Sequence, residues 1–179
     1  MSVSSETTEI ISRKKALYGR YIDTKQWDKL SSIALPDAEL RFFEPDGSLT
    51  HVGRTPLAFT SPEQCTSFLH KLFGNAQTLH MFGRGELEQT KADEVRAIWP
   101  MEDQIILRQG WLPVEVRGGG YYYETWRQKD HDWFLQSLVL RRTYSKPSML
   151  AWLGGLLSWY TRPKTDQVFD AMDGRYQRD

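Results

Sequence analysis

The chain has 179 residues, which is enough for one domain with a substantial hydrophobic core. Its 23 lysines and arginines balance its 23 aspartates and glutamates, so no overall charge favours nucleic acid or an anionic membrane as a partner. Cys65 is the only cysteine, which excludes an intrachain disulfide and, in practice, a thiolate metal site.

Neither the first residues nor the longest apolar run indicates a membrane segment. Residues 1–8 are polar and lack the apolar core of a signal peptide. The longest apolar run, residues 149–159, is too short to span a bilayer. We therefore expect a soluble, cytoplasmic protein that binds neither membrane nor nucleic acid.

The first predicted helix covers residues 9–24, where Thr7 or Thr8 can act as its N-terminal cap. Tyr18 and Tyr21 fall near its apolar face. Asp23 closes the helix on that same face. A carboxylate is thereby presented toward whatever the helix packs against.

Two more helices and a hairpin complete the first half of the chain. A short helix is predicted over residues 26–35, and a longer one follows Ser61-Pro62 and runs to residue 73. Between them, the turn signal at residues 45–48 predicts a hairpin with arms at 38–44 and 49–54.

The second half of the chain has the period-two pattern of β-strands. The run 118–120 consists of three glycines and is predicted to be a turn. Strands are expected over residues 77–89, 93–103, 105–116, 119–129 and 132–143. Helices followed by a long antiparallel meander indicate an α+β fold.

The first of these strands carries a histidine in an apolar setting. Alternation from Thr78 to Phe82 places His80 on the same face as those two residues. Gly83 and Gly85 weaken the strand and predict a bulge or a sharp bend. Such a histidine is placed either for chemistry in a pocket or for a hydrogen bond within the core.

The chemistry that the motifs allow is narrow. The four histidines have no metal-ligand spacing, and there is no phosphate-binding loop, dinucleotide fingerprint or nucleophile elbow. What remains is a pocket without metal or cofactor. Aromatic residues form 13% of the chain, which fits either an aromatic-lined pocket or ordinary core packing. His80 and Asp23 could form a base and its orienting carboxylate if the first helix packs across the sheet.

Six segments resemble the SnoaL-like family of the nuclear transport factor 2-like superfamily, and within it the scytalone dehydratase-like proteins. They are Asp23-Thr24-Lys25-Gln26-Trp27-Asp28-Lys29-Leu30, Ala38-Glu39-Leu40-Arg41-Phe42, Leu79-His80-Met81-Phe82-Gly83, Asp93-Glu94-Val95, 120–126 and 133–142. The resemblance covers roughly residues 9–144. It implies a cone-shaped half-barrel, in which a curved antiparallel sheet and N-terminal helices enclose a deep apolar cavity. Residues 1–145 would form this domain and residues 146–179 a C-terminal extension.

The resemblance also implies site residues. Asp23 matches the family's dehydratase aspartate and His80 the histidine that it supports. The family's second histidine, expected between residues 102 and 105, is missing. Tyr121 and Tyr123 take the places of a pocket serine and asparagine.

One face of each strand is expected to line the cavity. By the resemblance this face carries Thr125 beside the two tyrosines. We also place inward the apolar stripe formed by alternate residues of the neighbouring strand, which are Val95, Ala97, Trp99 and Met101. The predicted substrate-binding residues are Tyr18, Tyr21, Phe42, Trp99, Met101, Tyr121, Tyr123 and Thr125. Glu102 would face outward and is either a second acid or base or a structural residue.

The expected function is that of a cofactor-independent lyase or isomerase of secondary metabolism. A dehydratase, double-bond isomerase or cyclase would act on a polyketide-like or terpenoid-like substrate, with His80 and Asp23 as acid and base catalysts. Two alternatives remain: a non-catalytic ligand-binding or protein-interaction module, and an epoxide hydrolase with a carboxylate pair. A homodimer or homotrimer is expected, and residues 149–160 would form a lid, an oligomer contact or a surface helix.

Overall fold

The computed structural model describes residues 2–109 and 112–148. The helical elements are α1 (Ser5–Asp23), the 3-10 helix η1 (Trp27–Ser32) and α2 (Pro62–Phe73). The strands are β1 (Ala34–Phe43), β2 (His51–Val52), β3 (Thr55–Pro56), β4 (Ala58–Phe59), β5 (Gln77–Phe82), β6 (Glu86–Lys91), β7 (Glu94–Gln109), β8 (Leu112–Lys129) and β9 (Asp132–Pro147). The predicted α+β class is confirmed. The segment 149–160, predicted to form a lid, an oligomer contact or a surface helix, lies outside the described residues.

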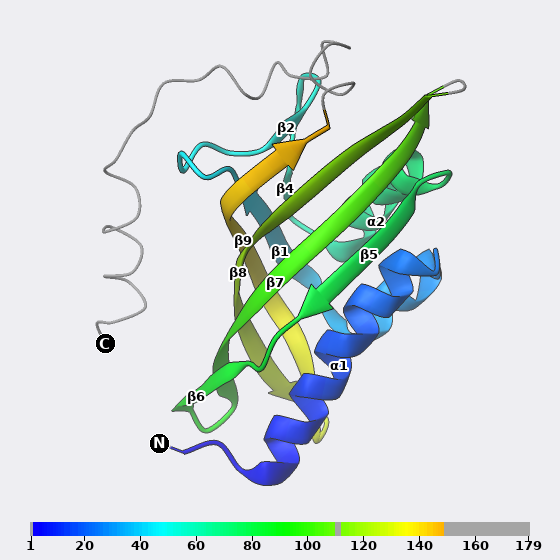
Figure 1. Ribbon diagram of the computed structural model, residues 1–179. Helices are drawn as coiled ribbons and strands as arrows, with labels where there is room; N and C mark the ends of the chain where they lie inside the picture. The colour runs from blue at the N-terminus through cyan, green and yellow to red at the C-terminus, as the bar shows by residue number, and fades with distance from the viewer. Residues whose placement is uncertain (1, 110–111, 149–179) are drawn as a thin grey trace.

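The main sheet has the strand order β4-β1-β9-β8-β7-β5, and β6 also pairs with β7 (Figure 1). The prediction of a wholly antiparallel sheet is wrong at one pair, because β1 runs parallel to β9. Parallel neighbours need a long connection, and here most of the chain separates the two strands. No pairing joins β4 to β5 among the described residues, and closure into a cone stays a prediction.

Strands β7 and β8 form a longer hairpin than the sequence predicted. The turn expected at residues 118–120 is wrong, since these glycines pair in mid-strand with Asp103, Glu102 and Met101. A Cβ on Gly118 would collide with the guanidinium of Arg142. The glycine run therefore marks a close approach of side chains from β9 and not a chain reversal.

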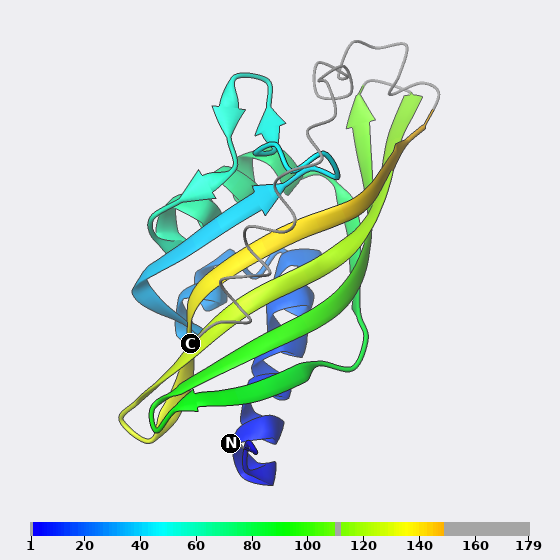
Figure 2. The ribbon, with the colours of Figure 1, turned by 90° about the vertical axis from the view of Figure 1, so that its left-hand side faces the viewer.

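Helix α1 lies across one face of the sheet, alongside β5 (Figures 1 and 2). It begins earlier than predicted, because Ser4 and not Thr7 or Thr8 is its cap and accepts from the N–H of Thr7 at 3.1 Å. Its buried face includes Ile11, Tyr18 and Ile22, which belong to the main hydrophobic core. This packing brings the end of the helix, and with it Asp23, to the edge strand β5.

The remaining elements follow the sequence in part. Helix α2 agrees with the prediction, and Ser61 caps it. Gly83 and Gly85 interrupt the strand, since β5 ends at Phe82 and β6 begins at Glu86, so the single strand predicted over residues 77–89 is divided in two. The predicted hairpin arm 49–54 is reduced to β2, which pairs with β3 in a separate two-stranded sheet.

A buried ion pair fixes α1 to the sheet. Nζ of Lys15 lies 2.5 Å from Oε1 of Glu124 on β8, and each side chain is at most 2% exposed. The other oxygen of Glu124 accepts hydrogen bonds from the indole N–H groups of Trp99 and Trp126, at 2.8 and 3.0 Å.

No helix among the described residues has the length and hydropathy needed to cross a bilayer.

Candidate active site

The expected contact between Asp23 and His80 is present. Nδ1 of His80 lies 2.7 Å from Oδ1 of Asp23, and the backbone N–H of His80 donates to Oδ2 at 2.8 Å. The hydroxyl of Thr78, on the same face of β5, donates to Oδ1 at 2.9 Å. Three hydrogen bonds from residues of β5 therefore hold the carboxylate that lies at the end of α1.

These contacts define which nitrogen of His80 carries a proton. Partial burial acts to raise the pKa of Asp23, but the hydrogen bonds and charge of His80 outweigh it and lower that pKa from its ordinary value. An ionised carboxylate can only accept, so Nδ1 is the donor and, in the neutral ring, Nε2 keeps a free lone pair. Among residues 2–109 and 112–148, no hydrogen-bond partner contacts Nε2.

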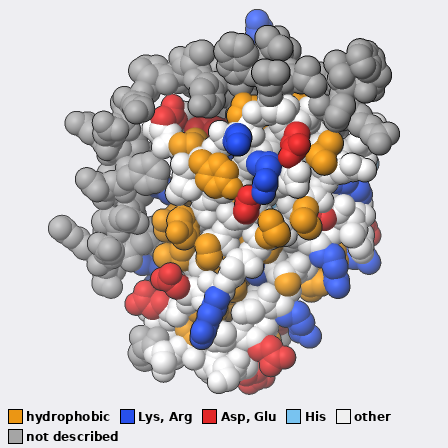
Figure 3. All heavy atoms as spheres, viewed as in Figure 1, with side chains coloured by type: hydrophobic (Ala, Val, Ile, Leu, Met, Phe, Trp, Pro, Cys, Tyr) orange, Lys and Arg blue, Asp and Glu red, His pale blue; other side chains and the backbone are white. Residues whose placement is uncertain are grey.

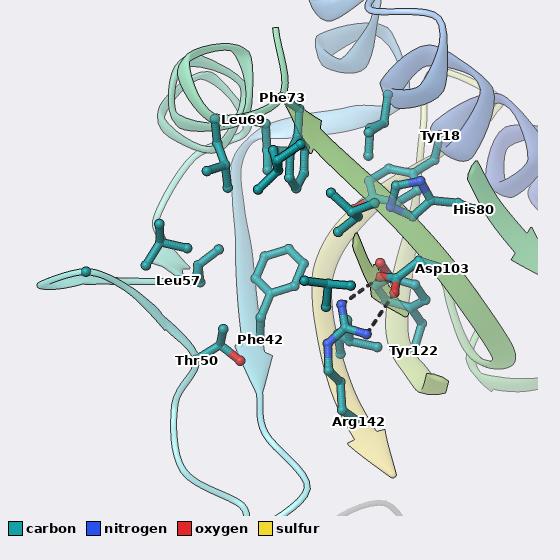
Figure 4. Close-up of a pocket in the computed structure, with 18 residues that line it drawn as sticks. Tyr18, Phe42, Thr50, Leu57, Leu69, Phe73, His80, Asp103, Tyr122 and Arg142 are labelled. Carbon is teal, nitrogen blue, oxygen red and sulfur yellow. Dashed lines mark hydrogen bonds and ion pairs between the residues drawn. The ribbon is translucent and has the colours of Figure 1, made fainter. Parts of the chain in front are cut away.

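His80 borders a cavity of about 150 Å³ that lies between the sheet, α1, α2 and the β2–β3 hairpin. Figure 4 shows that its polar groups lie together at one end, apart from Thr50. The polar end consists of Tyr18, His80, Asp103, Tyr122 and Arg142. The apolar walls include Ile22, Phe42, Leu57, Leu69, Phe73 and Leu140. The cavity thus suits a compact apolar ligand with one polar end.

The sequence prediction missed the second charged pair of this site. Nη1 and Nη2 of Arg142 donate to the two oxygens of Asp103 at 3.0 and 2.6 Å. Asp103 pairs directly with His80 in the β5–β7 ladder, so both side chains lie on the same face. The signal was available: Asp103 continues the inward stripe of residues 95–101, where an ionisable group is unusual.

Burial and neighbouring charges shift the pKa values of the ionisable groups at this end of the cavity. Burial acts to lower the pKa of Arg142, but the charge and hydrogen bonds of Asp103 raise it overall. Burial raises the pKa of Glu44, which accepts a hydrogen bond from Thr50 at 2.7 Å. Burial also raises the pKa of Tyr18 and Tyr122, so both phenols remain neutral donors near neutral pH.

The predicted substrate-binding residues divide between the cavity and other places. Tyr18 and Phe42 line the cavity. Trp99 and Met101 face inward and are buried, but they do not border it; Trp99 instead lines an open groove of about 730 Å³ that reaches His80 from the other side. Tyr21 is half-buried beside Lys29 and Arg20 rather than in the cavity.

The predicted face of β8 is wrong. Tyr122 and alternate residues after it point inward, whereas Tyr121, Tyr123 and Thr125 occupy the outer face and Tyr121 is 42% exposed. The reason is register: Trp99 pairs with Tyr122, and directly paired residues share a face. The inward stripe of β7 therefore fixes which residues of β8 face the cavity.

Glu102 lies on the outer face, as predicted. Its carboxylate accepts from Arg117 at 2.8 Å, and it does not border the cavity. In the part of the chain that the structure describes, no group of three or more histidine, cysteine or acidic side chains could hold a metal ion.

Comparison with known proteins agrees with the observed fold. A family profile described as "SnoaL-like domain" matches residues 3–139. The chain belongs to this family, as its sequence predicted. The chain is 39% identical to "Probable cyclase FGR4" of Gibberella zeae over 146 residues, and this alignment covers 82% of the chain and 97% of that protein.

Solved structures show the same fold at low sequence identity. A hexachlorocyclohexane dehydrochlorinase (LinA) type 2 has a TM-score of 0.63 at 19% identity, covering 80% of this chain and 93% of that one. LinA-type3 from Novosphingobium barchaimii has a TM-score of 0.62 at 20% identity, covering 80% and 94% of the two chains.

Proposed function

We propose that this protein is a cofactor-independent lyase or isomerase that uses His80 as a base on an enolisable carbonyl compound. The observation that carries the proposal is the Asp23–His80 hydrogen bond of 2.7 Å at the edge of a largely apolar cavity. Histidine suits this task because its neutral form accepts a proton near neutral pH. Asp23 would hold the ring and stabilise the imidazolium that forms.

The chemistry begins with one proton transfer. Nε2 of His80 takes a proton from the carbon next to the substrate carbonyl, and the electrons of that C–H bond move to the carbonyl oxygen to form an enolate. Arg142, Tyr18 and Tyr122 border the same end of the cavity and supply N–H and O–H donors for this oxygen. The imidazolium then returns the proton.

Where the proton returns decides the reaction class. Attack of the enolate carbon on a second carbonyl closes a ring, and the imidazolium protonates the new alkoxide. Loss of a β-hydroxyl as water gives dehydration, and protonation at a distant carbon gives a double-bond shift. The relative named probable cyclase FGR4 supports ring closure among these outcomes. The substrate that we propose for it is polyketide-like or terpenoid-like and belongs to secondary metabolism.

The two alternatives find less support. A non-catalytic module predicts a long distance between Asp23 and His80 or a filled cavity, and neither is observed. Epoxide hydrolysis needs a carboxylate pair in the cavity. Asp103 is the one carboxylate among the described lining residues, and Arg142 occupies both of its oxygens.

A homodimer or homotrimer is also part of this proposal. Leu79, Met81, Tyr121 and Tyr144 are large apolar side chains that stay exposed. On the face viewed in Figure 3, apolar side chains lie between charged ones. Contact with a second copy of the chain would remove these four side chains from water.

The test of the function uses exchange of α-protons, because exchange reports the first step whatever follows it. In D₂O, the wild-type protein should incorporate deuterium into ring-sized ketones, acetophenone among them, faster than the protein-free solution. Asp23→Asn should slow this exchange roughly 10- to 150-fold, the value of a charge-assisted hydrogen bond. Proton NMR of the ketone measures both rates.

The control is Asp28→Asn, which removes an exposed carboxylate outside the cavity. It should leave the exchange rate unchanged. The proposal fails if no ketone in the panel exchanges above background. It also fails if Asp23→Asn, like the control, exchanges at the wild-type rate.

A further inference from the structure

The polar end of the cavity contains one full positive charge and one full negative charge that cancel. Among the described lining residues, Arg142 is the one lysine or arginine and Asp103 the one aspartate or glutamate. Their side chains are 13% and 3% exposed and form a two-point fork. The cation is therefore already neutralised before any ligand arrives.

Among the residues that the structure describes, no other group at this end offers a free positive charge, because Lys15, which contacts the Tyr122 ring, is paired with Glu124. Glu44 faces Arg142 from the end of β1 and adds acidic character, and Asp46 lies near Glu44. Nδ1 of His80 is hydrogen-bonded to the carboxylate of Asp23, so a positive charge on this ring would already have a partner. A ligand carboxylate would therefore lose its water without gaining an unpaired cation, which is unfavourable.

A neutral oxygen meets different conditions. The guanidinium has five N–H donors, and the fork with Asp103 uses two of them. A remaining N–H, or a phenol of Tyr18 or Tyr122, can donate to a carbonyl oxygen without removing Asp103 from its partner. Charge that develops on that oxygen later still lies beside the guanidinium.

The size of the cavity limits the ligand body. Its volume is about 150 Å³, and a dry protein cavity of about this size accepts benzene. Its walls are apolar aromatic and aliphatic side chains. A single ring with a short substituent fits this space.

We propose that Asp103 acts as a specificity residue that makes the cavity select neutral, single-ring carbonyl compounds over carboxylates of the same shape. The inference rests on the cavity being the binding site of the proposed function, and it adds the substrate class. It assigns no proton transfer to Asp103.

The test compares two ligands of nearly equal shape, acetophenone and benzoate, by NMR titration of the ¹⁵N-labelled protein at neutral pH. The wild type should bind acetophenone at least about tenfold more tightly than benzoate. Asp103→Asn frees the charge of Arg142 and should raise benzoate affinity at least about tenfold, as a charge-assisted pair allows. Acetophenone affinity should change much less.

The matched control is Glu102→Gln, which breaks an arginine–carboxylate pair one residue away on the outer face. It should leave both affinities unchanged. The inference is overturned if the wild type binds benzoate as tightly as acetophenone, if it binds neither, or if folded Asp103→Asn gains no affinity for benzoate. Should Asp103→Asn not fold, the wild-type comparison alone decides.

Failure of this inference is distinguishable from failure of the proposed function. His80→Ala should keep the wild-type preference for acetophenone, because selection by charge does not require the base. Exchange without the preference overturns the inference alone, and the preference without exchange overturns the proposed function alone.

Discussion

His80→Ala should reduce α-proton exchange by about 10²- to 10⁴-fold, the usual contribution of a positioned general base. The variant removes the acceptor that borders the cavity, and no other described lining residue is a histidine. We expect the variant still to unfold cooperatively on heating, because the His80 ring lies at the edge of the cavity and not in the main hydrophobic core.

His70→Ala is the matched control. This histidine is exposed on α2, stacks on Trp27 at 5.8 Å and does not border the cavity. Exchange at the wild-type rate is expected. Equal losses of exchange in the two histidine variants would mean that the effect comes from a change in the fold. Exchange at the wild-type rate by His80→Ala would show that His80 is not the base.

Glu124→Ala should lower the free energy of unfolding by about 3–5 kcal/mol, the range for removing one partner of a buried ion pair. Lys15 would lose its partner while remaining in the core, where burial already lowers its pKa. The indole N–H groups of Trp99 and Trp126 would lose their acceptor at the same time. Denaturant unfolding followed by tryptophan fluorescence measures this loss.

Glu39→Ala provides the comparison for that measurement. Its pair with Arg41 also has a short distance, 2.7 Å, but both side chains are about half exposed. Water and salt screen such a pair, so a loss of at most about 1 kcal/mol is expected. Equal losses in the two variants would show that burial of the Lys15–Glu124 pair does not anchor α1.

The contact between Asp23 and His80 was predictable because two independent signals agreed. Asp23 closes the apolar side of a clear helix, and His80 alternates with apolar residues on a clear strand. The family resemblance supplied the packing of that helix on that strand, which spacing alone does not define.

What could not be predicted depends on register and on side chains that meet across strands. Whether Tyr121 or Tyr122 faces the cavity is decided by pairing with Trp99, and a shift of one residue reverses the answer. The run of glycines from Gly118 has the composition of a turn, yet it provides space for Arg142. The inward position of Asp103 could have been predicted from the stripe on β7, but its pair with Arg142 could not, because the two residues are distant in sequence and meet only in the folded sheet.

The ¹⁵N NMR spectrum of the His80 ring, recorded with and without acetophenone, tests most directly whether Asp23 prepares His80 to act as a base. We predict that the neutral form of this ring has its proton on Nδ1, held by Asp23, and an unprotonated Nε2 whose resonance shifts when the ketone binds. A proton on Nε2 in the neutral ring, or an Nε2 resonance that does not respond to a bound ketone, would contradict it.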